Sequence, residues 1–199
     1  DEMITGLRYK CSTVQDEFKL NPSISTFGKC LGGGMPIGII GIKANIAKKL
    51  NSSGKKVFFG GTFSGNSINM YVANKTVKYL INNKKKIFHS LNKKSIFLQN
   101  SLNNFFGENN LDAKCYKFSS MLRIVFSKKI LKNRLQRDFF EKNNQSLINK
   151  FKAYLFDKNI YLSSSGIIFL ATTTTEKDIK YLINTIRQAF RFLYRVKKK

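Results

Sequence analysis

Apolar positions divide the chain into short strand-like runs in its first third and long helical stretches after them. Apolar runs at 25–27 and 37–42 flank three consecutive glycines, which predicts two short buried strands connected by a tight turn. A third strand-like run lies at 57–59. Apolar residues then recur at helical spacing over 68–83, which predicts a helix there.

The rest of the chain alternates between helical and strand-like patterns, as a smaller α+β unit does. Helical periodicity predicts helices over 87–106, 137–156 and 176–194. Strand-like runs lie at 116–118, 121–126, 160–162 and 167–171. The last helix has Thr174 or Thr175 as its candidate N-cap and acidic residues in its first turn. We therefore divide the chain into the remainder of a larger α/β domain, residues 1–84, and a small C-terminal α+β domain, residues 85–199.

The charge of the chain allows two interpretations. There are 36 Lys and Arg residues against 11 Asp and Glu, a net charge of +25, but 42% of the residues are hydrophobic, which excludes intrinsic disorder. A basic binding module without catalysis is one interpretation, and it predicts salt-sensitive adhesion to polyanions. The lysines are spread along the chain, however, and no nucleic-acid-binding motif is present, so solvated helix faces are the preferred interpretation and no specific nucleic-acid partner is expected.

Cysteine and histidine usage limits the possible sites. The three cysteines, Cys11, Cys30 and Cys115, are scattered without a C-x-x-C pair, which argues against a disulfide framework or a cysteine-based zinc site and favours a reducing compartment. His89 is the one histidine of the sequence, and no metal site is expected. No apolar stretch approaches the roughly 20 residues of a membrane span. We therefore expect a cytoplasmic protein without a membrane partner.

Candidate chemistry lies in the first third, which holds eleven of the 13 glycines. Lys29 stands between an apolar strand and three glycines, an environment that removes water from an ammonium group and favours the neutral amine needed for a Schiff base. A lysine that extends to solvent is the alternative. Asp1 could pair with a pyridinium nitrogen, or be an ordinary acidic residue. Thr62, beside two glycines at a helix start, suits a phosphate oxygen or simply a turn, and Ser64 or Ser67 is the candidate N-cap.

Three segments in register resemble a known family. Residues 1–8, DEMITGLR, resemble the D-E-V-x-T-G-F-R signature of class III aminotransferases. Residues 26–38, TFGKCLGGGMPIG, resemble the family's G-K-x-x-G-G-G-x-P-x-G segment around its Schiff-base lysine. Residues 60–67, GGTFSGNS, are similar to the G-T-x-S-G-N-P loop that follows. The order and spacing agree, and the similarity points to the branch of glutamate-1-semialdehyde 2,1-aminomutase and related aminotransferases.

The resemblance implies the C-terminal part of a fold-type-I transferase dependent on pyridoxal 5'-phosphate (PLP). The fold would be α/β, with a mostly parallel sheet covered by helices on both faces in the large domain. Lys29 would hold PLP as a Schiff base, Asp1 would keep the ring nitrogen protonated, and Met3, where the family has Val, would pack on the ring. Thr62 would reach the PLP phosphate of the neighbouring subunit, which implies a homodimer with a shared active site.

The reaction implied is transfer of an amino group between a small-molecule donor and a carbonyl acceptor. Related aminomutases carry an acidic gating residue after the strand that matches 160–162, whereas residues 163–165 of this chain are serines. This departure favours a transaminase, with the intramolecular transfer of an aminomutase in tetrapyrrole synthesis as the alternative. Arg123 could bind a substrate carboxylate or stabilise a sheet edge.

Overall fold

A computed structural model describes residues 1–52 and 60–195 of the chain. They form two compact units, Asp1–Phe88 and His89–Lys199, and the division falls within helix α4. The expected strand at 57–59 lies outside the described residues. The assignment of residues 1–84 and 85–199 to a large and a small domain stays a prediction.

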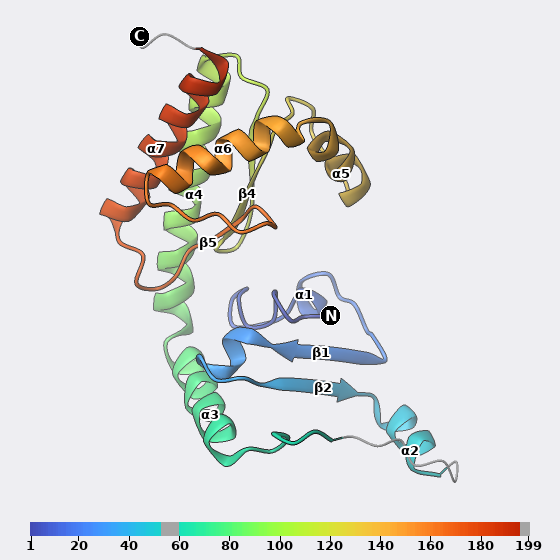
Figure 1. The fold of residues 1–199 in the computed structure, drawn as a ribbon. Helices are drawn as coiled ribbons and strands as arrows, with labels where there is room; N and C mark the ends of the chain where they lie inside the picture. The colour runs from blue at the N-terminus through green and yellow to red at the C-terminus, as the bar shows by residue number, and fades with distance from the viewer. Residues whose placement is uncertain (53–59, 196–199) are drawn as a thin grey trace. The chain divides into compact units, whose positions relative to one another are not determined.

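The first unit is organised around one strand pair (Figure 1). Strand β1 pairs antiparallel with β2, in a register that runs from Ile24 opposite Ile42 to Gly28 opposite Gly38. The turn expected at the three glycines begins with a short 3-10 helix, η1, directly after β1. The elements of this unit are α1 (Val14–Glu17), β1 (Ile24–Gly28), η1 (Lys29–Gly32), β2 (Gly38–Ile42), α2 (Ala44–Ser52) and α3 (Ser67–Asn82).

The burial expected for the run at 37–42 is wrong, because Ile39 is 38% exposed and Ile40 55%. The run at 25–27 is half-buried, and Ile24 just before it is 52% exposed. An apolar strand is buried on both faces only when layers cover both faces of its sheet. Every strand pairing in the described ranges is antiparallel, so the parallel sheet implied for the large domain is not made by β1 and β2 by themselves.

Helix α3 is anchored on η1. A Cβ atom added at Gly33 would lie 2.1 Å from the Thr76 hydroxyl oxygen, so the helix packs directly on the glycine backbone. The cap of α3 differs from expectation, because Asn66 rather than Ser64 or Ser67 accepts a hydrogen bond, from the Asn69 N–H at 3.1 Å. An asparagine carbonyl caps a helix as well as a serine hydroxyl does.

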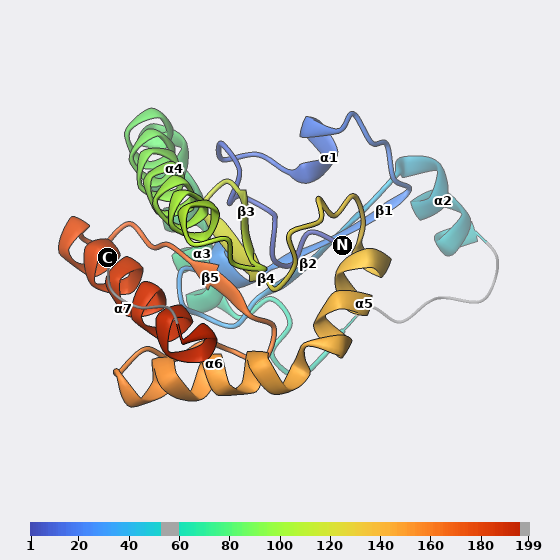
Figure 2. The same cartoon turned by 90° about the horizontal axis from the view of Figure 1, so that it is seen from above.

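The second unit combines a small sheet with four helices (Figure 2). The sheet has strand order β3-β4-β5, with both pairings antiparallel, and the expected hairpin at 119–120 connects its first two strands. Helices α4 and α7 lie side by side in both views. The elements are α4 (Lys84–Glu108), β3 (Lys114–Phe118), β4 (Met121–Val125), α5 (Arg134–Asn143), α6 (Gln145–Asp157), β5 (Ile167–Phe169) and α7 (Glu176–Tyr194).

Two elements differ from the predicted ones. The helix expected over 137–156 is two helices, separated at Asn144, whose side-chain amide donates to the carbonyl oxygens of Phe126 at 3.2 Å and Phe140 at 2.9 Å. An asparagine that bonds nearby backbone in this way competes with a continuous helix. The strand expected at 160–162 is absent from the described structure, because the Ile160 N–H donates to the Leu155 carbonyl and closes α6 instead.

Helix α7 spans the predicted residues, 176–194. Thr175 is its N-cap: the Thr175 hydroxyl accepts from the Asp178 N–H, and the Asp178 carboxylate accepts from the Thr175 N–H. These reciprocal bonds form a capping box. Hydrogen bonding from the Thr175 hydroxyl lowers the pKa of Asp178.

Four phenylalanines form the centre of the second unit. Phe190 of α7 is fully buried, and its ring centroid lies 4.6 Å from that of Phe106, 5.2 Å from Phe126 and 5.4 Å from Phe151. These rings come from α4, from the residue after β4, and from α6. Phe190 therefore joins three otherwise separate elements, and aromatic pairs at such distances stabilise a core beyond their buried area.

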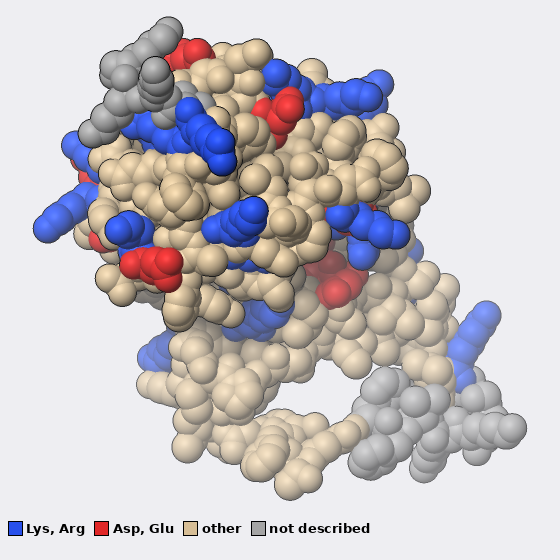
Figure 3. Space-filling model, turned by 45° about the horizontal axis from the view of Figure 1, so that its top comes forward, with Lys and Arg blue, Asp and Glu red and all other residues tan. Residues whose placement is uncertain are grey.

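The charges on the face shown in Figure 3 are dispersed. Lys and Arg side chains there are separated by neutral residues and interspersed with Asp and Glu. That face therefore presents solvated charges rather than one basic block. Among the described helices, none combines the length and apolar character needed to cross a membrane.

Replacement of Phe190 by alanine tests this core. We expect Phe190→Ala to lower the free energy of unfolding by about 3–5 kcal/mol, because it removes the contacts with three phenylalanine rings and with the Tyr194 ring and leaves a cavity. Phe156→Ala is the matched control, since Phe156 is 66% exposed on α6, and it should cost less than about 1 kcal/mol. Urea unfolding followed by circular dichroism measures both, and equal losses would contradict the assignment.

Candidate functional site

The first three residues are fixed to the middle of β1. The Asp1 carboxylate oxygen Oδ1 accepts hydrogen bonds from the Met3 N–H at 2.8 Å and from the Thr26 hydroxyl at 3.0 Å. The Glu2 N–H donates to the Thr26 carbonyl oxygen at 2.8 Å. Thr26 therefore holds this segment through both its backbone and its side chain.

Met3 packs against the residue that precedes Lys29. A Cβ atom added at Gly28 would lie 2.6 Å from the Met3 methyl carbon Cε and 2.9 Å from the Ile37 carbonyl oxygen. Real Cβ atoms essentially never come that close to another heavy atom. A larger residue at this position would force the Met3 side chain and the backbone at Ile37 to shift. The structure thus brings Asp1, Met3 and Lys29 together at the C-terminal half of β1.

The surroundings of Lys29 differ from those expected. Lys29 begins η1 with a left-handed backbone, φ of 50°, and its side chain is exposed, with no hydrogen bond or ion pair to any described residue. Successive residues of a 3-10 helix face different sides, so neighbours that are apolar in sequence do not enclose the side chain between them. We expected the Lys29 amine to be shielded from water, but residues 1–52 and 60–195 leave it exposed.

A buried carboxylate that the motif analysis missed organises the segment. Glu2 is only 3% exposed; its Oε1 accepts from the Gln15 N–H at 2.9 Å, and its Oε2 accepts from the Thr5 hydroxyl. Burial raises the pKa of Glu2, but the hydrogen bonds from Thr5 and Gln15 outweigh it, so the net pKa is lowered. Glu2 and Thr5 both match letters of the D-E-V-x-T-G-F-R signature, but no structural role was predicted for either of them from the sequence.

Thr62 is not brought to this group by any contact among the described residues. It is exposed in a turn in which the Ser64 N–H donates to the Gly61 carbonyl at 2.9 Å. The start of the following helix is tied to the turn after η1, because the Asn69 side-chain amide donates to the Pro36 carbonyl at 2.7 Å. The phosphate-binding role of Thr62 stays a prediction.

The cysteines do not compete with Lys29 as nucleophiles. Cys30, next to Lys29, donates through its thiol to the Gly6 carbonyl oxygen at 3.1 Å, and burial raises its pKa. Burial likewise raises the pKa of Cys115 to about 12. Both remain protonated thiols at neutral pH. Within the described residues no three His, Cys, Asp or Glu side chains group as metal ligands do.

Arg123 has a structural partner. Its guanidinium forms two hydrogen bonds with the Glu141 carboxylate, at 2.8 Å from Nε and 2.7 Å from Nη2. This forked pair connects β4, the central strand of the sheet, with α5. Of the two roles that the sequence left open, a substrate carboxylate or a sheet edge, the structural one is nearer, but Arg123 stabilises the centre of the sheet, and its donors toward Glu141 are already used.

The close contact at Gly28 predicts that a methyl group added there destabilises the fold. Gly28→Ala should lower the free energy of unfolding by about 1–3 kcal/mol, because its methyl group collides with Met3 and the Ile37 carbonyl. Gly38→Ala, opposite it on β2 with no neighbouring atom within 4 Å, should change it by less than about 1 kcal/mol. Adding Met3→Ala to Gly28→Ala should restore part of the loss in urea titrations.

The Glu2 network predicts a pH dependence. Because the pKa of Glu2 is lower in the folded chain than its ordinary 4.5, its contribution is complete above that value and is lost as pH falls through the folded-state pKa. Glu2→Gln should therefore cost about 1–3 kcal/mol near neutral pH and progressively less as the pH falls below 4.5. Urea titrations at several pH values test this, and a cost that stays constant with pH would contradict it. Glu108→Gln, at the exposed end of α4, is the control.

Comparison with known proteins identifies the sequence family. Residues 1–117 match the family described as Aminotransferase class-III. Over 182 residues the chain is 34% identical to the glutamate-1-semialdehyde 2,1-aminomutase of Caldicellulosiruptor saccharolyticus, covering 90% of this chain and 42% of that protein. It is 31% identical over 195 residues to the Francisella tularensis protein of the same name, covering 96% and 44%. The chain thus spans less than half the length of these relatives.

Solved structures share the fold. An omega-transaminase from Sphaerobacter thermophilus matches with a TM-score of 0.80 and 18% identity, over 98% of this chain and 44% of that one. A glutamate-1-semialdehyde aminomutase from Pseudomonas aeruginosa in complex with PMP matches with a TM-score of 0.82 and 15% identity, over 97% and 44%. The predicted fold class, α/β as in part of a fold-type-I PLP transferase, is confirmed.

The family match covers more than half of the chain and includes all three motif segments. This chain belongs to the class III aminotransferases.

Proposed function

We propose that the protein transfers amino groups with PLP as its cofactor, and that Lys29, Asp1 and Met3 hold that cofactor. The observation that carries the proposal is the attachment of residues 1–3 to β1, which sets an acidic and a thioether side chain beside the strand that leads into Lys29. The substrates would be a small-molecule amino donor and a carbonyl acceptor.

Asp1 and Lys29 each keep one functional group without a partner in the described structure, and these groups fit the chemistry of PLP. Asp1 uses Oδ1 for its two hydrogen bonds, and Oδ2 has no partner in the described part of the chain. A carboxylate held in this way suits a protonated ring nitrogen. The exposed Lys29 amine is likewise uncommitted in residues 1–52 and 60–195, as an amine that binds an aldehyde must be.

Each residue then has a distinct task. When bound, PLP supplies an electron sink that stabilises negative charge on the substrate carbon. The Lys29 Nζ would hold the cofactor aldehyde, and the same amine would carry a proton to and from the substrate carbon. The Asp1 Oδ2 would keep the ring nitrogen protonated, and the Met3 thioether would pack against the ring. Because Lys29 is exposed in this chain, exclusion of water falls to groups outside the described residues.

Thr62 supports an extension of the proposal to a homodimer. Its hydroxyl is exposed in the turn that precedes α3, a helix whose first N–H groups suit an anion. No contact among the described residues brings it to Lys29. We infer that Thr62 of one copy binds the PLP phosphate in the neighbouring copy.

A glutamate-1-semialdehyde 2,1-aminomutase is the second candidate function. The identities of 31–34% to curated proteins of that name favour it. The serines at 163–165, where related aminomutases have an acid, favour a transaminase. The structure has these serines in an exposed turn, with the Gly166 N–H donating to the Ser163 carbonyl at 2.9 Å.

Reductive trapping tests the cofactor proposal. Equimolar PLP followed by borohydride should place the pyridoxyl label on Lys29, located by peptide mass spectrometry. Lys29→Ala should lose this label, whereas Lys78→Ala, which removes an exposed lysine from α3, should retain it. A label spread equally over the surface lysines in both variants would contradict the proposal.

The dependence on an amino acceptor distinguishes the two candidate functions. An intramolecular transfer consumes glutamate 1-semialdehyde without any added acceptor, whereas a transaminase requires one. Assay of the protein loaded with PLP, with and without a 2-oxo acid, should show acceptor-dependent turnover if the transaminase proposal holds. Turnover that is independent of the acceptor would establish the aminomutase instead.

A further inference from the structure

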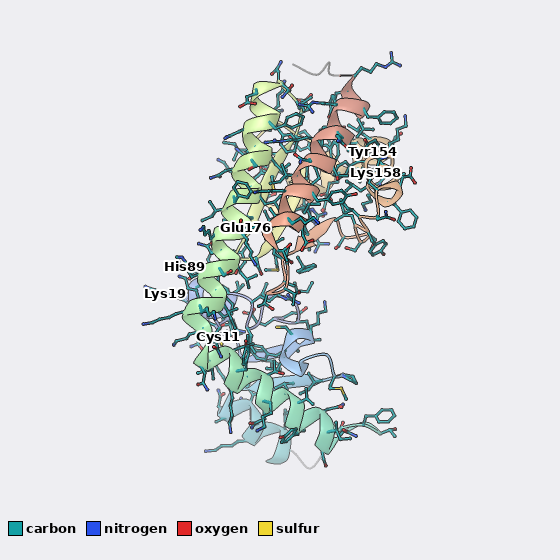
Figure 4. The ribbon with its side chains drawn as sticks, turned by 90° about the vertical axis from the view of Figure 1, so that its left-hand side faces the viewer. Cys11, Lys19, His89, Tyr154, Lys158 and Glu176 are labelled. Carbon is teal, nitrogen blue, oxygen red and sulfur yellow. The ribbon has the colours of Figure 1, made fainter. Side chains whose placement is uncertain are left out.

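A cavity of about 500 Å³ lies in the second unit, between α4 and the first turns of α7. Figure 4 shows two of its lining residues, His89 on α4 and Glu176 at the start of α7. Its size is within the range of small-molecule sites in proteins. None of its lining residues belongs to the first unit, so the cavity is independent of the residues proposed to hold PLP.

Helical spacing gathers the polar lining. His89 and Lys93 are four residues apart on α4, and Glu176 and Lys180 are four apart on α7, so each pair shares one face of its helix. Lys94 fixes the two helices to each other, because its amine donates to the Thr174 carbonyl oxygen, just before α7, at 2.5 Å. The cavity is thus a feature of the packed unit rather than of one helix.

The charge of the lining favours an anion. It contains Lys93, Lys94 and Lys180 against one carboxylate, Glu176. Lys94 is occupied by its backbone partner, but the amines of Lys93 and Lys180 form no hydrogen bond or ion pair with any described residue. Two uncommitted ammonium groups in one cavity suit a phosphate. The N-terminus of α7 contributes little to anion binding, since the capping box already uses the Thr175 N–H.

The floor of the cavity is apolar. Phe97 of α4 is 48% exposed although it lines the cavity, and the buried side chain of Ile179 lies beside it in the lining. A half-exposed aromatic ring offers a face on which a planar group stacks. A ligand that satisfies the whole lining therefore carries a phosphate at one end and an aromatic ring at the other, with a donor for Glu176.

We propose that this cavity binds a nucleoside phosphate. The phosphate lies between Lys93 and Lys180, and the base stacks on Phe97. A ribose hydroxyl donates to the Glu176 carboxylate, the one acid of the cavity lining. Inorganic phosphate has no ribose and would lack this contact.

Calorimetric titration with ADP, adenosine and inorganic phosphate tests the proposal on the whole protein. ADP should bind more tightly than either of the other two. Lys180→Gln should weaken ADP binding at least tenfold. Lys177→Gln is the matched control, because Lys177 is exposed on the same helix and outside the cavity, and its loss changes the net charge equally.

Phe97→Ala separates the two halves of the ligand. It should weaken ADP binding several-fold and leave inorganic phosphate unaffected. Equal effects of Lys177→Gln and Lys180→Gln would show general attraction of an anion to a basic protein and overturn the proposal. If inorganic phosphate bound as tightly as ADP, the role of the base would be overturned. If ADP did not bind to a protein that circular dichroism shows to be folded, the whole proposal would be overturned.

Discussion

The hydrogen bonds that attach residues 1–3 to Thr26 are the constraint on which the candidate site depends. Thr26 accepts from the Glu2 N–H and donates its hydroxyl to Asp1, so a short irregular segment takes a fixed register on β1. An irregular segment is otherwise mobile, because ordering each residue costs about 1–2 kcal/mol of conformational entropy. The buried Glu2 carboxylate adds a second anchor through Thr5 and Gln15. The Asp1 carboxylate is thereby fixed by the Met3 N–H and the Thr26 hydroxyl, and the backbone that carries Met3 is fixed with it.

The same register explains why glycine precedes Lys29. With residues 1–3 held on β1, the Met3 side chain reaches Gly28, where no Cβ fits. Gly33, the C-cap of η1, has a similar function, since α3 packs on it through Thr76. Small residues thus let two elements approach the Lys29 backbone closely while the lysine side chain stays open. The glycine-rich stretch is a packing device as much as a flexible turn.

Local sequence patterns predicted many of the helices and strands, but they predicted contacts between residues distant in sequence less well. The helix at 176–194 depends on residues close in sequence, so its bounds and the choice of Thr174 or Thr175 as its N-cap could be predicted from the pattern, and the structure adds that Thr175 forms a capping box with Asp178. The break at Asn144 was missed because its amide bonds Phe126, eighteen residues away. In the candidate site, Asp1, Met3 and Lys29 were found by their motifs, whereas the buried state of Glu2 depends on Gln15, thirteen residues distant. What failed were the contacts that no local pattern encodes.

The two wrong expectations about burial have one physical cause. A run such as that of β2 is typical of a strand covered on both faces, and a lysine among apolar residues and glycines is typical of an amine removed from water. Strand burial and a lysine amine removed from water both require a sheet with further strands and covering helices. In the described structure β1 and β2 have one strand partner each. A two-stranded pair leaves its faces to solvent, so Ile39, Ile40 and Lys29 are exposed together. Because successive residues of a strand point to opposite faces, Ile39 and Ile40 lie on different faces of the pair, so burying both requires a layer on each side of the sheet.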